Sequence, residues 1–143
     1  MDWMTPIYLL MALLFVLVNG FFVLAEFALV KVRATRIVEL ARQQNRRAIV
    51  AHNMVLHLDR YLAATQLGIT VASLGLGWVG EPAFAGTIEA VIGLPGWWSP
   101  TVSRGASATA AFLIITFLHI LLGELAPKSL AIRRPERSTL TIA

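Results

Sequence analysis

One carboxylate, Glu124, closes a long apolar stretch of this chain and is the residue best suited to chemistry. The preceding residues 106–123 contain no Asp, Glu, Lys or Arg. A charge at the end of an apolar helix is costly unless a cation, a proton or hydrogen bonds meet it. Pro127 follows three residues later and has no N–H to donate, so we expect the Gly123 carbonyl to be free. A carboxylate beside a free carbonyl predicts a site for a small hard cation.

A structural explanation competes with this functional one. At the cytoplasmic interface Glu124 would be solvated and paired with Lys128, four residues later. A second carboxylate, Glu26, follows the first apolar block directly, and residues 27–30 continue the apolar run after it. It would either reach the interface with its charged end or pair with Lys31 or Arg60. Both carboxylates therefore have a structural interpretation as well as a functional one.

Other polar side chains inside the apolar blocks are further candidate ligands. Asn19 lies seven residues, about two helical turns, before Glu26, so the two share a helix face. Gln66, Thr70 and Ser73 follow one another at i, i+4 and i+7 and also share a face. Interhelical hydrogen bonding is the commoner use of such residues in membrane helices. The pattern predicts polar faces turned toward the interior of a bundle.

The sequence shows no pattern of a known catalytic centre. It has no cysteine and no Walker A, GxSxG or HExxH motif. His119 lies five residues before Glu124, about 140° round an α-helix, and is interpreted as a satisfied packing histidine. His52 and His57 lack a metal-ligand spacing. We therefore expect no enzyme.

Three blocks without charge indicate an all-α membrane protein. Of the 143 residues, 57% are hydrophobic and only 14% are charged, against roughly 25% charged in soluble domains. The blocks contain 23, 20 and 19 residues, and a spanning helix needs about 20. The first block lacks the basic start and the cleavage site of a signal peptide. The predicted transmembrane helices cover about residues 5–32, 59–80 and 104–125.

The net charge of +4 is concentrated on one side of the predicted spans. Lys and Arg gather in residues 31–60 and 128–137, whereas the 81–104 loop carries a single arginine. By the positive-inside rule the N-terminus lies outside and the C-terminus in the cytoplasm, in the cell (inner or plasma) membrane. The basic residues are interpreted as topology signals and contacts with anionic lipid. Nucleic-acid binding is not expected, because the sequence contains no basic stripe with stacking aromatic residues.

The remaining segments suggest how the spans are arranged. Residues 33–58 have the pattern of an amphipathic segment on the cytoplasmic interface, with a break at 43–45. The second span contains four glycines, which favours a central position because small residues let helices approach closely. We expect Glu81 and Pro82 to end it. A juxtamembrane segment begins at Arg133, and because it stops at Ala143 we expect the chain to be a fragment.

Three segments, residues 19–30, 64–82 and 123–128, together resemble the transmembrane domain of the cyclin M/CorC family, also known as hemolysin-C-like proteins. The resemblance covers essentially all of residues 1–143. It implies three transmembrane helices with a juxtamembrane belt, working as a homodimer. Family members continue into cytosolic CBS modules and a CorC-type domain, both absent from this chain. The family is associated with magnesium (Mg²⁺) export, coupled to sodium (Na⁺) in some members.

The resemblance also assigns residues. Glu124 matches the family's cation-binding glutamate, and Glu26 matches a glutamate of the first helix. The family's serine before that glutamate is Ala25 here, and two asparagines of magnesium-binding members are Ile69 and Ser73. Losing two side-chain oxygens weakens an octahedral magnesium cage unless water or other protein oxygens replace them. The expected cation site comprises Glu124, Gly123, Ser73, Thr70 and Asn19, with Glu26 shaping the charge of the cavity.

Two functions from different classes follow from these residues. The first is a membrane ion-transport domain for a divalent cation, expected to be magnesium, working by alternating access. The alternative is a membrane anchor, assembly or sensor module that positions cytosolic regulatory domains without transport. Ala25 and Ile69 favour the alternative.

Overall fold

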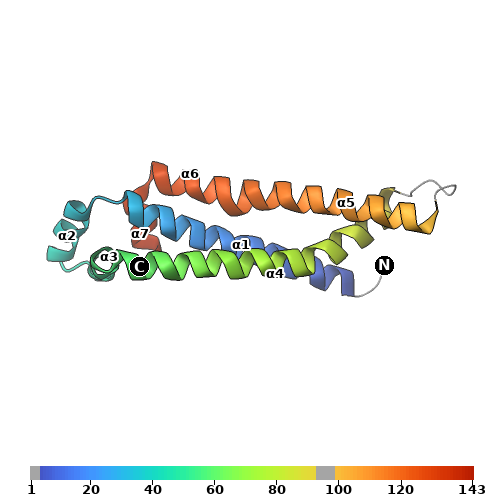
Figure 1. The fold of residues 1–143 in the computed structure, drawn as a ribbon. Helices are drawn as coiled ribbons and strands as arrows, with labels where there is room; N and C mark the ends of the chain where they lie inside the picture. The colour runs from blue at the N-terminus through green and yellow to red at the C-terminus, as the bar shows by residue number, and fades with distance from the viewer. Residues whose placement is uncertain (1–3, 93–98) are drawn as a thin grey trace.

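The computed structural model describes residues 4–92 and 99–143, and all regular elements in these ranges are helical. Three helices are long and apolar enough to span a membrane. They are α1 (Met4–Lys31), the Leu58–Gly80 part of α4 (Leu58–Ile92), and a continuous helical run, Pro100–Arg133. The three run alongside one another in a slender bundle (Figure 1). The predicted all-α membrane fold with three spans is confirmed.

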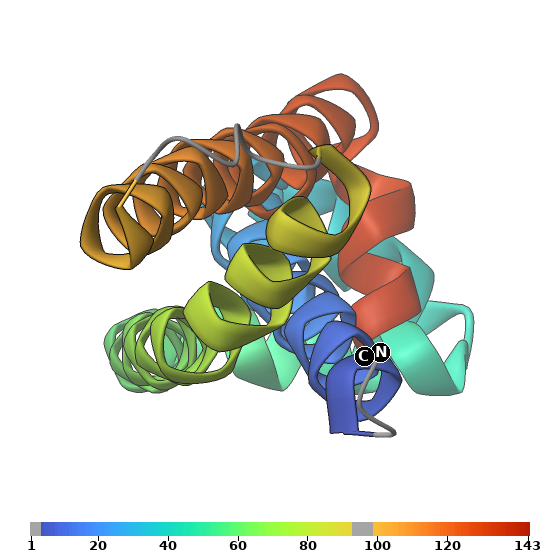
Figure 2. The same cartoon turned by 90° about the vertical axis from the view of Figure 1, so that its right-hand side faces the viewer.

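The central helix of the bundle is α1. It packs against α4 and against the η1 (His119–Leu125) and α6 (Ala126–Arg133) parts of the third span, while α4 also contacts α5 (Pro100–Leu118), and the view along the bundle shows the three spans side by side (Figure 2). The second span, α4, instead exposes large apolar side chains such as Leu67, Leu74 and Trp78. The central position expected for the glycine-rich span is therefore wrong, because one face of α4 is open although its glycines contact both neighbours: Gly68 and Gly75 face α1, and Gly80 faces Ile115 of α5.

Two glycines of α4 receive phenylalanine rings from α1. A Cβ added to Gly68 would lie 2.6 Å from the ring of Phe22, and one added to Gly75 would lie 2.5 Å from that of Phe15. Both pairs are spaced by seven residues, about two turns, so the rings enter successive notches. Gly77 differs, because a Cβ there would meet nothing within 4 Å. Close approach of α1 and α4 thus depends on the first two glycines.

The second span does not end at Glu81 and Pro82 as expected. The α4 helix continues to Ile92. Its C-terminal part, yellow in Figure 1, bends away from the line of the preceding turns. A proline removes one helix hydrogen bond and crowds the preceding turn, which kinks a helix that is held on both sides.

The amphipathic segment forms two short helices, α2 (Ala34–Arg42) and α3 (Arg46–Leu56). The predicted break between them is confirmed: Gln44 has a φ of 59°. Asn45 then caps α3, its side-chain oxygen accepting two backbone N–H bonds at 3.1 and 3.3 Å. The segment lies across the end of the bundle (Figure 1).

The third span passes through three helical elements without a loop. They are α5 (Pro100–Leu118), a π-helical segment η1 (His119–Leu125) and α6 (Ala126–Arg133). The helix end predicted near residue 125 is wrong. Pro127 removes one helix hydrogen bond, but the wider π turn of η1 lets the helix continue into α6. After Arg134, α7 (Pro135–Ile142) packs back against α1, next to α3.

Candidate functional site

Three polar groups from the three spans meet inside the bundle. Nδ2 of Asn19 on α1 donates a hydrogen bond to the carbonyl oxygen of Gly123 in η1, at 3.0 Å. The hydroxyl of Ser73 on α4 donates to Oδ1 of Asn19 at 3.3 Å. Asn19 is only 2% exposed. The structure therefore brings together three of the six residues expected at the cation site.

Two glycines permit this meeting of α1 with η1. A Cβ on Gly20 would lie 3.1 Å from Cγ of Pro127. A Cβ on Gly123 would lie 2.8 Å from Cδ2 of His119 and 3.2 Å from Nδ2 of Asn19. A side chain at Gly20 would crowd Pro127 of α6, and one at Gly123 would crowd His119 on its own helical segment and Asn19 on α1. The glycine after Asn19 and the glycine before Glu124 thus set the distance that the Asn19–Gly123 hydrogen bond requires.

The π segment gives the Gly123 region its unusual backbone. The N–H of Ala126 bonds to the carbonyl of Leu121, five residues back, which is the π pattern. The sequence predicts a free Gly123 carbonyl because Pro127 removes a donor. In the structure this carbonyl is not free, because it accepts the bond from Asn19. Single π turns inside α-helices occur frequently at functional sites.

The three oxygens of this chain have more acceptor positions than its side-chain hydrogen bonds fill. A carbonyl or amide oxygen can accept two bonds, and a hydroxyl can accept two while it donates one. The Gly123 oxygen and Oδ1 of Asn19 each accept one side-chain bond, and Ser73 donates. These are oxygens of the kind that a hard cation prefers. Within residues 4–92 and 99–143, no three His, Cys, Asp or Glu side chains cluster as metal ligands, so a cation here would rely on these neutral oxygens and one carboxylate.

Glu124 lies beside this chain of bonds, with an exposed side chain. The ion pair with Lys128 that the sequence suggests does not form, because Nζ of Lys128 lies 4.6 Å from the ring centre of Phe27 on α1. Glu124 is also not at a helix end. It precedes Arg133 by nine residues, about 14 Å of helix, which is about half the thickness of the hydrocarbon core.

The two other expected site residues are not part of the hydrogen-bonded chain. Glu26 is half-buried, and in the described part of the molecule it pairs with neither Lys31 nor Arg60. Thr70 is exposed, and its hydroxyl donates to the carbonyl of Gln66 on its own helix at 2.9 Å.

His119 lies at the site although the sequence did not place it among the expected ligands. Its ring lies against Gly123, and its buried Nε2 has no hydrogen-bond partner among the described residues. The interpretation as a satisfied packing histidine is wrong in that respect. The 140° separation from Glu124 assumed an α-helix, whereas this turn is π-helical. Apart from Pro127, the sequence carries no signal of that change.

Comparison with known proteins agrees with this architecture. Residues 9–143 match the sequence model of the family described as the cyclin M transmembrane N-terminal domain. UPF0053 protein YhdT of Bacillus subtilis (strain 168) is 48% identical over 128 residues, covering 87% of this chain and 27% of the relative. UPF0053 protein YrkA of the same organism is 44% identical over 140 residues, covering 98% and 32%. The uncharacterized protein Rv1841c of Mycobacterium tuberculosis (strain ATCC 25618 / H37Rv) is 39% identical over 133 residues, covering 93% and 37%.

The chain spans about a third of the length of these relatives. No solved structure is significantly similar to it. The match over residues 9–143, together with three membrane-length helices, establishes that the chain belongs to the cyclin M family and corresponds to its transmembrane N-terminal domain.

Proposed function

We propose that this domain carries a divalent cation, with magnesium the leading candidate, out of the cell, and that sodium is the candidate coupling ion. The observation that supports the proposal most is the Asn19–Gly123 hydrogen bond. It holds neutral oxygens from two spans beside Glu124, deep in the apolar part of the third span. Movement would follow alternating access at this crossing, without chemistry on a substrate.

The exposed state of Glu124 is the second support. A carboxylate at this depth is costly against lipid, so a cation, water or another protein surface must meet it. Among the described residues it has no ion pair. We propose that a second copy of the chain faces Glu124 and that the homodimer encloses the water-filled path to it. The basic helical end of the bundle would face the cytoplasm, where the cytosolic CBS modules of the full-length protein would follow.

The available ligands fit a partly hydrated magnesium ion. Magnesium prefers octahedral oxygen coordination and usually keeps several waters. Glu124, Gly123, Asn19 and Ser73 supply four protein oxygens, which leaves the other positions to water. Ile69 supplies none, which is consistent with a site that relies on water more heavily.

Replacing Glu124 by glutamine tests the site in the full-length protein. With the protein in proteoliposomes and a magnesium-sensitive dye as the readout, we expect Glu124→Gln to lower flux at least tenfold, because the amide is neutral (about 1.4 kcal/mol per decade). Asp59→Asn, on the exposed first turn of α4, is the matched control and should transport normally. Unchanged flux in Glu124→Gln would refute the assignment.

A non-transporting anchor is the second candidate, and one observation favours it. The Ser73–Asn19–Gly123 chain joins all three spans through direct hydrogen bonds between protein groups, as a purely structural crossing would. Calorimetric titration of the full-length protein with Mg²⁺, Mn²⁺ and Na⁺ separates the two functions. An anchor should bind none of them, whereas the transport domain should bind one, and Glu124→Gln should abolish that binding.

A further inference from the structure

A second polar site lies at the end of the bundle where α2, α3 and α7 gather. There an open cavity of about 1300 Å³ is bounded by the end of α1, by α2 and α7, and by parts of α3 and α6. Its lining includes seven basic and two acidic side chains, a net charge of +5. Nothing in the proposed transport path uses this cavity.

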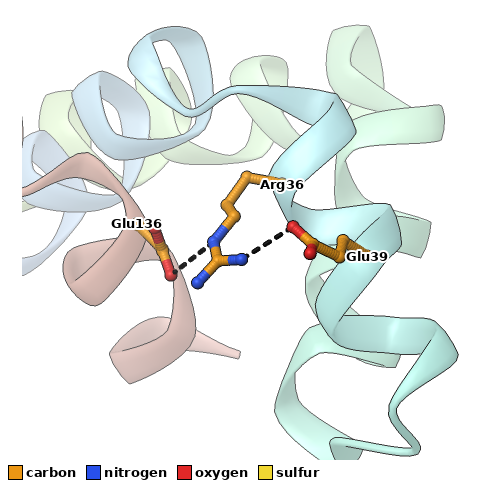
Figure 3. A network of polar contacts seen from close by, with 3 residues as sticks. All are labelled: Arg36, Glu39 and Glu136. Carbon is orange, nitrogen blue, oxygen red and sulfur yellow. Dashed lines mark hydrogen bonds and ion pairs between the residues drawn. The ribbon is translucent and has the colours of Figure 1, made fainter.

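A single arginine, Arg36, forms ion pairs with both acidic side chains of the cavity. Nη1 of Arg36 lies 2.7 Å from Oε2 of Glu39, and its Nε lies 3.4 Å from Oε1 of Glu136 on α7 (Figure 3). The hydrogen bond to Glu39, followed by the charge of Glu136, raises the pKa of Arg36 above its ordinary value. The other six basic side chains have no ion pair in the described ranges. These six are Lys31, Arg33, Arg47, Arg133, Arg134 and Arg137.

The cavity lies at the ends of two helices that are long and apolar enough to span a membrane. Lys31 is the last residue of the first span, and Arg133 is the last residue of the third. Phospholipid phosphates lie at this level, just beyond the hydrocarbon core. Val32, Pro135 and Leu140 add apolar surface to the lining. A ligand with both an anionic and an apolar part therefore suits the cavity.

We propose that this cavity binds the headgroup phosphate of an anionic phospholipid from the adjacent leaflet. Arginine guanidinium groups bind phosphate oxygens through paired hydrogen bonds, and basic pockets at helix ends of membrane proteins accept anionic headgroups. A soluble phosphate would satisfy the same groups, but a lipid is already concentrated at this level by the bilayer. The bound headgroup would join α7 to α2 across the open side of the cavity.

This proposal differs from a diffuse attraction between basic residues and the membrane. Arg46 and Arg60 belong to the same basic region and are exposed, yet neither lines the cavity. A diffuse belt would use them as readily as Arg134 and Arg137, whereas a bounded site would not. The two pairs carry the same charge, which makes them matched variants.

The test uses the full-length protein in mild detergent and measures lipid binding by native mass spectrometry. Phosphatidylglycerol is compared with phosphatidylcholine of the same acyl chains and with inorganic phosphate. We expect Arg134→Gln/Arg137→Gln to weaken phosphatidylglycerol binding by about 25-fold, roughly fivefold for each charge. Arg46→Gln/Arg60→Gln should have a clearly smaller effect. Arg134→Lys/Arg137→Lys keeps the charge but loses the paired hydrogen bonds, so its binding should fall between that of the unaltered protein and that of Arg134→Gln/Arg137→Gln, which controls for folding.

Three results would overturn the proposal. Equal loss of binding in the two glutamine pairs would mean diffuse attraction without a site. Inorganic phosphate that binds as tightly as phosphatidylglycerol would assign the cavity to a soluble ligand. Absence of lipid binding, with cross-links from the cavity to residues beyond 143 of the full-length protein, would assign it to the chain itself. None of these results bears on cation flux, so the lipid site and the proposed transport fail separately.

Discussion

Asn19 on α1 and Gly123 in η1 are joined by a buried hydrogen bond of 3.0 Å, although they lie 104 positions apart in the sequence. Asn19 is buried, so the Gly123 carbonyl depends on this side chain for its partner in place of bulk water. The bond also fixes the position of Glu124 along the bundle, because Glu124 follows Gly123 directly. Ser73 extends the same link to the remaining span. The crossing therefore stabilises the fold and positions the proposed ligands together.

Replacing Asn19 by leucine tests the structural part of this statement. Asn19→Leu keeps a similar size but leaves the Gly123 carbonyl without its side-chain donor. We expect a loss of about 0.6–1.7 kcal/mol in the free energy of unfolding, the range measured for interhelical hydrogen bonds in membranes. Unfolding of the full-length protein in mixed micelles measures it. Asn53→Leu, at an exposed position of α3, is the control. Equal stability of the two variants would show that the bond contributes nothing.

The glycines of α4 should differ sharply in their tolerance of alanine. Gly68→Ala and Gly75→Ala each place a methyl group against a phenylalanine ring of α1, at 2.6 and 2.5 Å. We expect each to cost about 1–3 kcal/mol of stability, as overpacking does. Gly77→Ala adds the same methyl group where nothing lies within 4 Å and should leave stability unchanged or higher. Thermal unfolding of the three variants makes the comparison. A similar loss of stability in all three would contradict the packing of the α1 phenylalanine rings against Gly68 and Gly75.

The overall fold could be predicted because charge-free blocks report directly on membrane-spanning length. The break at residues 43–45 was equally accessible, since Asn45 is a good helix cap. The course of the helices past Pro82 and Pro127 could not be predicted in the same way. A proline in the sequence indicates that one helix hydrogen bond is missing. The packing of neighbouring helices then decides whether the helix ends, kinks or shifts into a π turn.

The candidate site was only partly predictable for a similar reason. Periodicity placed Asn19 and Ser73 on helix faces, but their meeting with Gly123 depends on how closely the spans cross at Gly20. The i, i+4 rule offered Lys128 as the partner of Glu124. It could not reveal that an aromatic ring on another helix competes for the same cation.

The two ion pairs of Arg36 should have different consequences. Glu136 joins α2 to α7, whereas Glu39 lies in the same helix as Arg36. We expect Glu136→Gln to speed amide hydrogen exchange in α7, because that helix loses its ionic tie. Glu39→Gln should leave α7 unchanged. Equal exchange of α7 in both variants would show that the tie is unimportant.

The pH dependence of this tie follows from the raised pKa of Arg36. A group with a raised pKa in the folded state stabilises the fold fully below its unfolded pKa. That contribution is lost only as the pH rises through the folded pKa. The arginine side of the tie should therefore be unaffected between about pH 6 and 9. Exchange of α7, corrected for the intrinsic rate, should stay constant over this interval.

The contact between Lys128 and Phe27 leads to a prediction about transport. At 4.6 Å from the ring centre, the ammonium group is held by an attraction worth about 0.5–2 kcal/mol. Without the ring, Lys128 is free to pair with Glu124 one turn earlier, where it would compete with a transported cation. We expect Phe27→Leu to lower magnesium flux in proteoliposomes and to raise the magnesium concentration needed for half-maximal flux. Phe27→Leu/Lys128→Gln should restore both, because the competing charge is gone. If the double variant transports no better than Phe27→Leu alone, the loss comes from altered packing at α1 and not from the freed lysine.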